Sequence, residues 1–212
     1  VASSQNLPVL RLYDSILDRR PATYLEKMGF SRLTEGDYVH LSTAIGGLTN
    51  GATVEENVNA YATFANNGQF LDAYMIERIE DLDGNIIYEH QVEPVDIFSP
   101  ETAYMMTDML RGVLQEGGTA TLGKSQLKFS SDFAAKTGTT QDHKDVWLVG
   151  YNPNISIGVW LGYDQPRTLF AFNNRYQHPS NRVNRLWANY LNALYDVNPE
   201  YIGTKDTFQQ PE

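Results

Sequence analysis

The sequence predicts an α+β fold, an α/β sandwich in which helices flank an antiparallel sheet. Three observations predict it. Several segments carry apolar residues at helical spacing, strand-like apolar runs gather between residues 134 and 162, and an Asp83-Gly84 turn separates two more such runs. With 212 residues, of which 42% are hydrophobic and 12% aromatic, the chain can bury a substantial core.

The first quarter of the chain is predicted to be mainly helical. Apolar residues at helical spacing predict a partly buried helix over residues 7–18. A short second helix follows Pro21 and is closed by Gly29, because glycine readily takes the left-handed conformation at a helix end. A turn is expected at Gly46-Gly47.

Two further helices have clear start signals. Thr53, followed three residues later by Glu56, is a capping-box pattern, and the helix it begins is expected to stop at Asn67-Gly68. Ser99-Pro100-Glu101 supplies an N-cap, a proline at the first helical position and an early acid. We expect Gly117-Gly118 to end that helix.

The predicted strands fall into two groups. Residues 74–79 and 85–89 flank the Asp83-Gly84 turn and predict a hairpin. Residues 146–150 and 155–162 predict two strands joined around Asn152-Pro153-Asn154, with a strand containing Lys136 beside them at an edge of the sheet.

An amphipathic helix is expected to begin near Ser180-Asn181 and to cover one face of this sheet. We assign residues 1–200 to one domain and residues 201–212 to an extended C-terminal tail. No internal repeat or low-complexity linker divides the chain.

Composition excludes several classes of protein. A net charge of −10 argues against a nucleic-acid partner, which usually needs a basic face. The four histidines show no metal-ligand spacing, cysteine is absent, and no phosphate-loop or dinucleotide motif is present, so neither a metal nor a cofactor is predicted. No run of apolar residues approaches the length of a membrane span.

Lys136-Thr137-Gly138, followed by Thr139, has the chemistry of a carboxylate-binding strand. A peptide can pair with a strand edge through main-chain hydrogen bonds while an ammonium and hydroxyls bind its terminal carboxylate. Gly138 would let such a ligand approach closely. A second motif, Ser4-Gln5-Asn6, lies near the start of the chain.

With these two motifs the chain resembles the penicillin-binding transpeptidases, which share Ser-x-x-Lys, Ser-x-Asn and Lys-Thr-Gly motifs with the serine β-lactamases. The closest likeness is to the bifunctional class A penicillin-binding proteins, through residues 59–68, 135–140 and 145–151. The resemblance runs from Ser4 to about Asp164, and it implies a penicillin-binding, serine β-lactamase-like fold.

The resemblance implies roles for six residues. Ser4 and Lys136 would be catalytic, Ser4 relaying a proton to or from the leaving amine and Lys136 favouring that relay electrostatically. Asn6 would bind the substrate amide, and the Thr139 backbone N–H would supply half of an oxyanion hole. The implied substrate-binding residues are Asn6, Thr137, Gly138 and Thr139.

The family's nucleophile lies in a Ser-x-x-Lys motif that precedes Ser-x-Asn, and we expect it on an N-terminal companion segment outside this chain. Without that segment the fold would be incomplete. Ser125-Gln126-Leu127-Lys128 matches the string but lies on the wrong side of Ser-x-Asn. We interpret it as a coincidence in a loop or at a strand entry.

The implied reaction is cross-linking of peptidoglycan stem peptides by serine acyl transfer, and β-lactam antibiotics would trap the acyl-enzyme. The implied location is the extracytoplasmic face of the bacterial membrane, anchored through the absent N-terminal part. The parent protein would also carry a peptidoglycan glycosyltransferase domain.

Two alternatives stay open. A β-lactam sensor or a non-catalytic peptidoglycan-binding module would keep the cleft without turnover. A class A β-lactamase needs a glutamate in a loop, and residues 55–59 superficially match its Glu-x-x-x-Asn pattern. The match is discounted, because the capping signal and the apolar period put these residues on a helix. The second motif also reads Ser-Gln-Asn instead of Ser-Asp-Asn.

Overall fold

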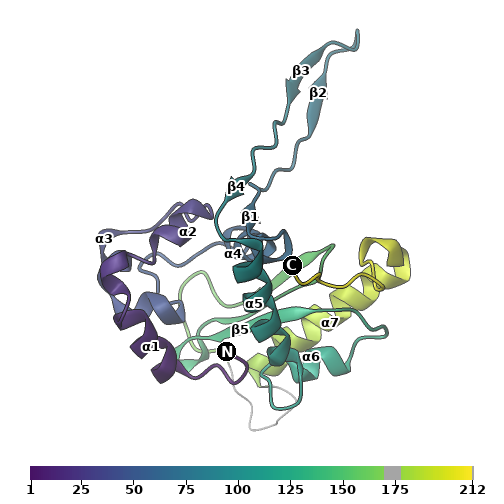
Figure 1. The fold of residues 1–212 in the computed structure, drawn as a ribbon. Coiled ribbons are helices and arrows are strands. Elements are labelled where there is room, and N and C mark those ends of the chain that lie inside the picture. Colours follow the sequence, from purple (N-terminus) through teal and green to yellow (C-terminus); the bar gives the residue numbers. More distant parts are fainter. Residues whose placement is uncertain (170–177, 212) are drawn as a thin grey trace.

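A three-stranded antiparallel sheet forms the centre of the computed structural model, which describes residues 1–169 and 178–211 (Figure 1). Its strands are β5 (Ala134–Thr139), β6 (Val146–Tyr151) and β7 (Ser156–Leu161), in the order β5-β6-β7. Lys136 on β5 lies opposite Val149 on β6. The prediction of three adjacent antiparallel strands, with the motif strand on the outside, is confirmed for this part of the chain.

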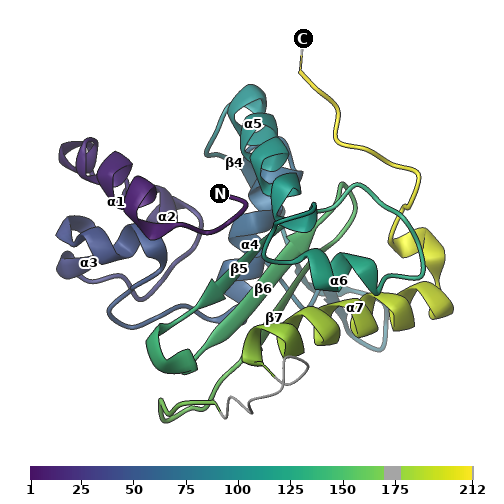
Figure 2. The same ribbon diagram turned by 90° about the horizontal axis from the view of Figure 1, so that it is seen from below.

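Helices cover both faces of this sheet. Figure 2 shows α7 (Pro179–Val197) along one side and α4 (Val54–Ala65) on the other. The packing is close because glycines remove side chains from the strands. A Cβ at Gly150 would lie 2.6 Å from the Trp187 ring, and one at Gly158 would collide with Val58 of α4. The predicted amphipathic helix over the sheet is confirmed.

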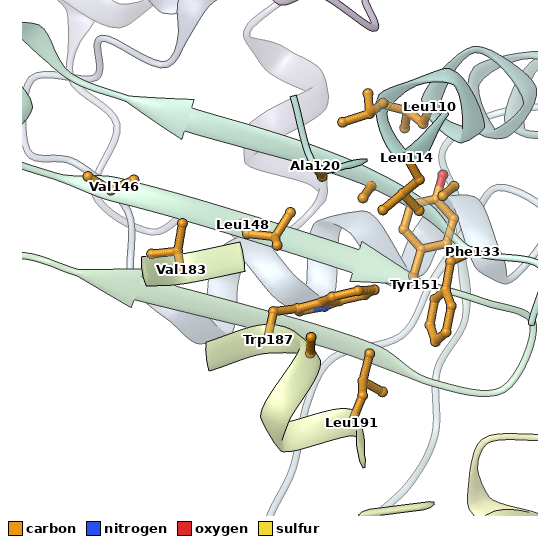
Figure 3. Packing of buried hydrophobic residues seen from close by; sticks show 14 of the residues in the cluster. Leu110, Leu114, Ala120, Phe133, Val146, Leu148, Tyr151, Val183, Trp187 and Leu191 are labelled. Atoms are coloured by element: carbon orange, nitrogen blue, oxygen red, sulfur yellow. The ribbon is translucent and has the colours of Figure 1, made fainter. Parts of the chain in front are cut away.

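The main core lies between the sheet, α7 and α5 (Pro100–Arg111) (Figure 3). Trp187 and Tyr151 are fully buried, and the Tyr151 hydroxyl pairs with the buried Thr107 hydroxyl of α5 at 3.0 Å. Burying rings of this size supplies most of the driving force for folding at such a site. The largest fully buried apolar side chains are Trp187, Tyr151, Leu114, Leu148, Leu191, Ile202, Val113, Val146 and Val183.

The predicted helix starts are confirmed. Thr53 Oγ1 accepts the Glu56 backbone N–H at 3.1 Å, and Glu56 Oε2 accepts the Thr53 backbone N–H at 2.8 Å, so the capping box is complete. Ser99 Oγ accepts the Thr102 backbone N–H at 3.3 Å at the start of α5. Glu55 and Glu56 therefore lie on a helix, and not in the loop that a class A β-lactamase would need.

Two helix ends differ from prediction. α5 ends at Arg111 and is followed by a 3-10 turn over Gly112–Leu114, because the chain turns before Gly117-Gly118 to bury Val113. At the first helix, α1 (Asn6–Asp14) stops four residues early, and a separate 3-10 turn covers Leu17–Arg19.

The residues before α4 fold as a helical lobe with a smaller core. Besides α1 it contains α2 (Thr23–Lys27), α3 (Glu35–Val39) and a 3-10 helix over Leu41–Ile45. No residue of α1 is buried. The lobe's buried cluster, which also includes residues from α4 and the strands beyond it, consists of Met28, Phe30, Ala60, Phe70 and Ile97.

Asp37 anchors this lobe. Its carboxylate, 2% exposed, accepts the backbone N–H groups of Thr34 and Thr49 at 2.7 and 2.8 Å, and both of their hydroxyls at 3.0 Å. Burial opposes ionisation, but these four hydrogen bonds outweigh it and lower the pKa of Asp37 to about 2.

A long hairpin projects from the body of the molecule (Figure 1). β2 (Arg78–Glu80) and β3 (Ile86–Glu89) pair antiparallel around Asp83-Gly84, as predicted, over fewer residues than the sequence pattern suggests. Every residue of both strands is exposed. β1 (Gln69–Phe70) and β4 (Val95–Asp96) pair at the base of the hairpin.

The end of the chain packs on the sheet. Ile202 is fully buried, and its carbonyl accepts a hydrogen bond from the Asn152 side-chain amide at 2.7 Å. The Phe208 ring meets the Tyr151 ring edge-on with centroids 5.7 Å apart. A domain boundary at residue 200 stays a prediction, and the residues after it contribute to the core up to Phe208.

Candidate active site

The two sequence motifs meet in space. Lys136 Nζ on β5 donates a hydrogen bond of 2.7 Å to Ser4 Oγ, which lies 132 residues away in the sequence. Figures 1 and 2 both show the N-terminal segment running beside β5. The fold therefore joins an ammonium and a hydroxyl, the pair that the motifs predicted.

Ser4 is held by its backbone, in an unusual conformation. Its φ of 51° lies in the left-handed region, which non-glycine residues seldom occupy without a structural or functional reason. Its N–H donates to the Val1 carbonyl at 3.0 Å. The N-cap of α1 is Gln5, so Ser4 does not cap that helix and its hydroxyl is left for Lys136.

Lys136 is half-buried, and burial lowers the pKa of its ammonium below the ordinary lysine value. Nζ makes a second hydrogen bond, of 2.6 Å, to the Thr137 carbonyl. Within residues 1–169 and 178–211, no carboxylate forms an ion pair with it. An ammonium held by neutral oxygens alone keeps its charge available to an anionic ligand.

The outer edge of β5 presents main-chain groups. Thr140 N–H donates to the Asp145 carbonyl at 3.0 Å, which continues the β5–β6 ladder. Because bonded and non-bonded pairs alternate in an antiparallel ladder, the N–H and C=O groups of Thr137 and Thr139 point away from β6. The Thr139 N–H therefore faces the side of the strand where a ligand would pair.

Gly138 has a packing reason as well as a ligand reason. A Cβ at this position would lie 3.3 Å from the Cβ of Trp147 on the neighbouring strand. A side chain here would require Trp147 to shift by a few tenths of an ångström.

The remaining predicted residues lie nearby, with one addition. Asn6 is the first residue of α1, two positions after Ser4, and its side chain is exposed. The Thr137 hydroxyl lies 2.5 Å from the hydroxyl of Thr119, a residue that the sequence analysis did not single out. The available signal was the Gly117-Gly118-Thr119 run, which we interpreted only as a helix end.

The Ser125-x-x-Lys128 string lies elsewhere and is engaged in local contacts. Ser125 ends α6 (Thr121–Ser125), so its predicted position in a loop or strand entry was wrong, and its hydroxyl donates to the Leu122 carbonyl at 2.9 Å. Lys128 Nζ pairs with Asp196 of α7 at 2.5 Å. The interpretation of the string as a coincidence agrees with this geometry.

No cluster of three or more potential metal-ligating side chains occurs in the described part of the chain. The His143 and His178 rings meet edge-on with centroids 4.8 Å apart. Among the helices described, none is both long enough and apolar enough to cross a membrane.

Comparison with solved structures defines the class of fold. The structure superimposes on penicillin-binding protein 1A from Haemophilus influenzae with a TM-score of 0.74 at 22% identity, covering 92% of this chain and 33% of that one. It is similarly close to the PonA1 protein from Mycobacterium tuberculosis in complex with penicillin V, with a TM-score of 0.72 at 19% identity, covering 94% and 56% of the two chains. The fold is that of penicillin-binding proteins.

Sequence comparison defines the family. A family model described as penicillin binding protein transpeptidase domain matches residues 3–180, and the chain belongs to that family of serine acyl-transfer enzymes. It is 31% identical to penicillin-binding protein 4 of Bacillus subtilis over 193 residues, which is 91% of this chain and 29% of that protein. It is 33% identical to penicillin-binding protein 1A of Neisseria flavescens over 180 residues, 80% of this chain and 21% of that protein.

These comparisons confirm the predicted resemblance to the transpeptidase domain of class A penicillin-binding proteins, and they confirm the predicted fold. The chain spans between 21% and 29% of the length of these two relatives.

Proposed function

We propose that this chain is the C-terminal part of a peptidoglycan D,D-transpeptidase that cross-links stem peptides and is acylated by β-lactams. The observation that carries the proposal is the 2.7 Å contact between Lys136 Nζ and Ser4 Oγ beside an open strand edge. An ammonium paired with a hydroxyl at such an edge suits proton relay next to a bound peptide.

The substrate would lie along the outer edge of β5 as an added strand. Its main-chain amides would pair with the groups of Thr137 and Thr139 that point away from β6. The terminal carboxylate would be bound by the hydroxyls of Thr137 and Thr139 and attracted by the Lys136 ammonium. Asn6 would donate its side-chain amide to a substrate carbonyl.

The chemistry divides between this chain and a segment outside it. A serine from the companion segment would attack the carbonyl of the penultimate D-Ala, forming an ester while the C–N bond breaks and D-Ala leaves. The lysine of the absent Ser-x-x-Lys would take the proton of the attacking serine, and this proton would reach the leaving amine through the Ser4 hydroxyl, with the neighbouring Lys136 ammonium stabilising the charge that develops there. An amine of a second stem peptide would then take the acyl group and release the serine.

The Thr139 N–H, which points away from β6, would stabilise the oxyanion formed in both steps. Removing one such donor lowers the rate roughly 100- to 1000-fold in acyl-transfer enzymes. A β-lactam carries a reactive amide and a carboxylate in the same relation as D-Ala-D-Ala. It would therefore acylate the same serine. Transfer of the acyl group to water instead of to an amine would make the enzyme a carboxypeptidase as well.

The proposal extends to the parent protein. Its partners would be peptidoglycan stem peptides, β-lactams and the remainder of its own chain, with no nucleic acid. We place the domain on the extracytoplasmic face of the bacterial membrane, held by an anchor outside this chain, and we propose a glycosyltransferase domain in the same protein.

Labelling of the full-length protein with a fluorescent penicillin, followed by a cross-linking assay on lipid-linked peptidoglycan precursors, tests the proposal. We expect a covalent adduct on a serine outside residues 1–212 and cross-linked product. An adduct without cross-linking would instead indicate a β-lactam sensor or a peptidoglycan-binding module. Rapid turnover of the penicillin would indicate a β-lactamase, and an adduct on this chain would overturn the assignment of the nucleophile.

A further inference from the structure

Thr119 touches both halves of the candidate site. Its hydroxyl lies 2.5 Å from the Thr137 hydroxyl on β5, at the short end of the range for O–H···O hydrogen bonds. Its backbone N–H donates to the Ala2 carbonyl at 3.3 Å, two residues before Ser4. One residue thus contacts the carboxylate-binding strand and the segment that carries the catalytic hydroxyl.

The loop that carries Thr119 is firmly built. Ala120 next to it is fully buried, and its N–H donates to the Val113 carbonyl at 2.9 Å. The Thr121 hydroxyl donates to the Gln115 and Gly118 carbonyls, at 2.6 and 2.8 Å. These contacts fix the backbone on either side of Thr119 while its own side chain stays exposed.

Neither hydroxyl is cut off from water, so neither needs the other as its hydrogen-bond partner. Both Thr119 and Thr137 could bond to water, since their side chains are accessible at the strand edge. The fold nevertheless brings together the side-chain oxygens of two residues that lie 18 positions apart in the sequence. A polar contact that satisfies no buried group points to a role in orienting one of its partners.

The chemistry of a hydroxyl pair gives that role. Each threonine has one O–H proton and two acceptor lone pairs. If Thr137 donates to Thr119, the Thr137 proton is occupied and cannot reach a ligand. If Thr119 donates to Thr137, the Thr137 proton is released toward the open edge, and the bond it then makes is strengthened by the one behind it.

We propose that Thr119 is a positioning residue for carboxylate recognition, which donates to Thr137 so that the Thr137 hydroxyl donates to the ligand carboxylate. The proposal rests on the proposed function of this site and deepens it. An anionic acceptor selects this arrangement, because hydrogen bonds to charged groups are about twice as strong as those between neutral groups. A ligand without the negative charge gains little from Thr119.

The test compares two ligands in the full-length protein. Benzylpenicillin carries the carboxylate and its methyl ester does not, and acylation by each is followed in competition with a fluorescent penicillin. Thr119→Val keeps the shape of the side chain and removes its hydroxyl. We expect it to slow acylation by benzylpenicillin roughly 2- to 10-fold, the effect of losing one hydrogen bond between neutral groups, with little change for the ester.

Two variants separate orientation from folding. Thr119→Ser keeps the hydroxyl and is expected to restore the benzylpenicillin rate. Thr121→Val removes a hydroxyl of the same loop that donates to the backbone carbonyls of Gln115 and Gly118. We expect it to lower the thermal stability and to leave the ratio of the two acylation rates as in the wild type.

The outcomes are distinct. A wild-type protein that neither ligand acylates would overturn the proposed function, and the role of Thr119 with it. Acylation of the wild type by both ligands, with Thr119→Val slowing both equally or neither, would overturn the role of Thr119 alone. A fall confined to benzylpenicillin and reversed in Thr119→Ser supports it.

Discussion

The two halves of the candidate site are built differently. Lys136 follows the fully buried Ala135 on a strand of the central sheet. The helix α7 covers this sheet with the fully buried Trp187. Ser4 precedes α1, a helix without one buried residue, and is positioned by backbone bonds near the N-terminus. The sheet half supplies a fixed charge, and the helical half brings a hydroxyl to it.

The contrast teaches where precision comes from in this site. A side chain on a packed strand is placed by the core, whereas Ser4 is placed by its left-handed backbone, its bond to Val1 and its contact with Lys136. Loss of packing around the sheet should therefore lower stability, whereas changes confined to Ser4 and the exposed α1 should leave stability nearly unchanged, and loss of the Ser4–Lys136 contact should lower activity. The following predictions test that division.

The largest expected effect is on activity, at the contact between the halves. We expect Lys136→Ala and Ser4→Ala each to lower cross-linking roughly 100- to 10,000-fold, the range for loss of a positioned proton-transfer group. Because the two act as one unit, the double variant should be little worse than either single one. Lys128→Ala is the matched control, since it removes a lysine whose exposed pair with Asp196 contributes little and takes no part in the Ser4–Lys136 contact.

The next effect is on stability and concerns the sheet half. Trp187→Ala leaves a cavity against Gly150 and should lower the free energy of unfolding by about 3 to 5 kcal/mol. Leu12→Ala, at a position of α1 that is 66% exposed, should change it by less than about 0.5 kcal/mol. Thermal melts of the transpeptidase domain measure both, and equal losses would contradict the division between the halves.

Asp37 gives the helical lobe its own pH dependence. The pKa of Asp37, lowered from 3.8 to about 2 by its hydrogen bonds, means that its stabilising effect is present above the ordinary value and is lost as the pH falls toward 2. Asp37→Ala should remove about 2 kcal/mol at pH 7 and flatten the loss of stability between pH 4 and 2. If the variant loses stability between pH 4 and 2 as steeply as the wild type, other carboxylates cause that loss.

The smallest effect is a displaced pH profile. Burial lowers the pKa of Lys136, so its ammonium is lost at a pH below the ordinary lysine value, near 10.4. The rate of acylation by benzylpenicillin should therefore begin to fall with rising pH before the pH reaches that value. Lys136→Arg, whose charge persists to higher pH, should lose this limb while retaining part of the rate. A limb that persists in the arginine variant would belong to another group.

Much of this architecture follows from local sequence signals. Thr53 with Glu56 and Ser99 with Pro100 fix helix starts because each signal is complete within four residues. Asp83-Gly84 likewise specifies a hairpin turn. The pairing of Ser4 with Lys136 could be expected from the resemblance, although spacing alone gives no hint of it.

Other features depend on contacts that no local pattern encodes. Thr119 was missed because its partner Thr137 belongs to another element, and the glycines before it had a sufficient local explanation. Ile202 and Phe208 lie beyond the last amphipathic helix, in a stretch without periodicity, yet they complete the core around Tyr151. α5 ends early because burial of Val113 and Leu114 overrides the glycine signal.

The contact between Ser4 and Lys136 also sets the order in which the site can form during folding. A contact over 132 residues closes almost two thirds of the chain, so its entropic cost must be met by packing that is already in place. During synthesis the serine is made first and the lysine long afterwards. The Ser4–Lys136 contact therefore forms only when the sheet does, and a partly made chain lacks it.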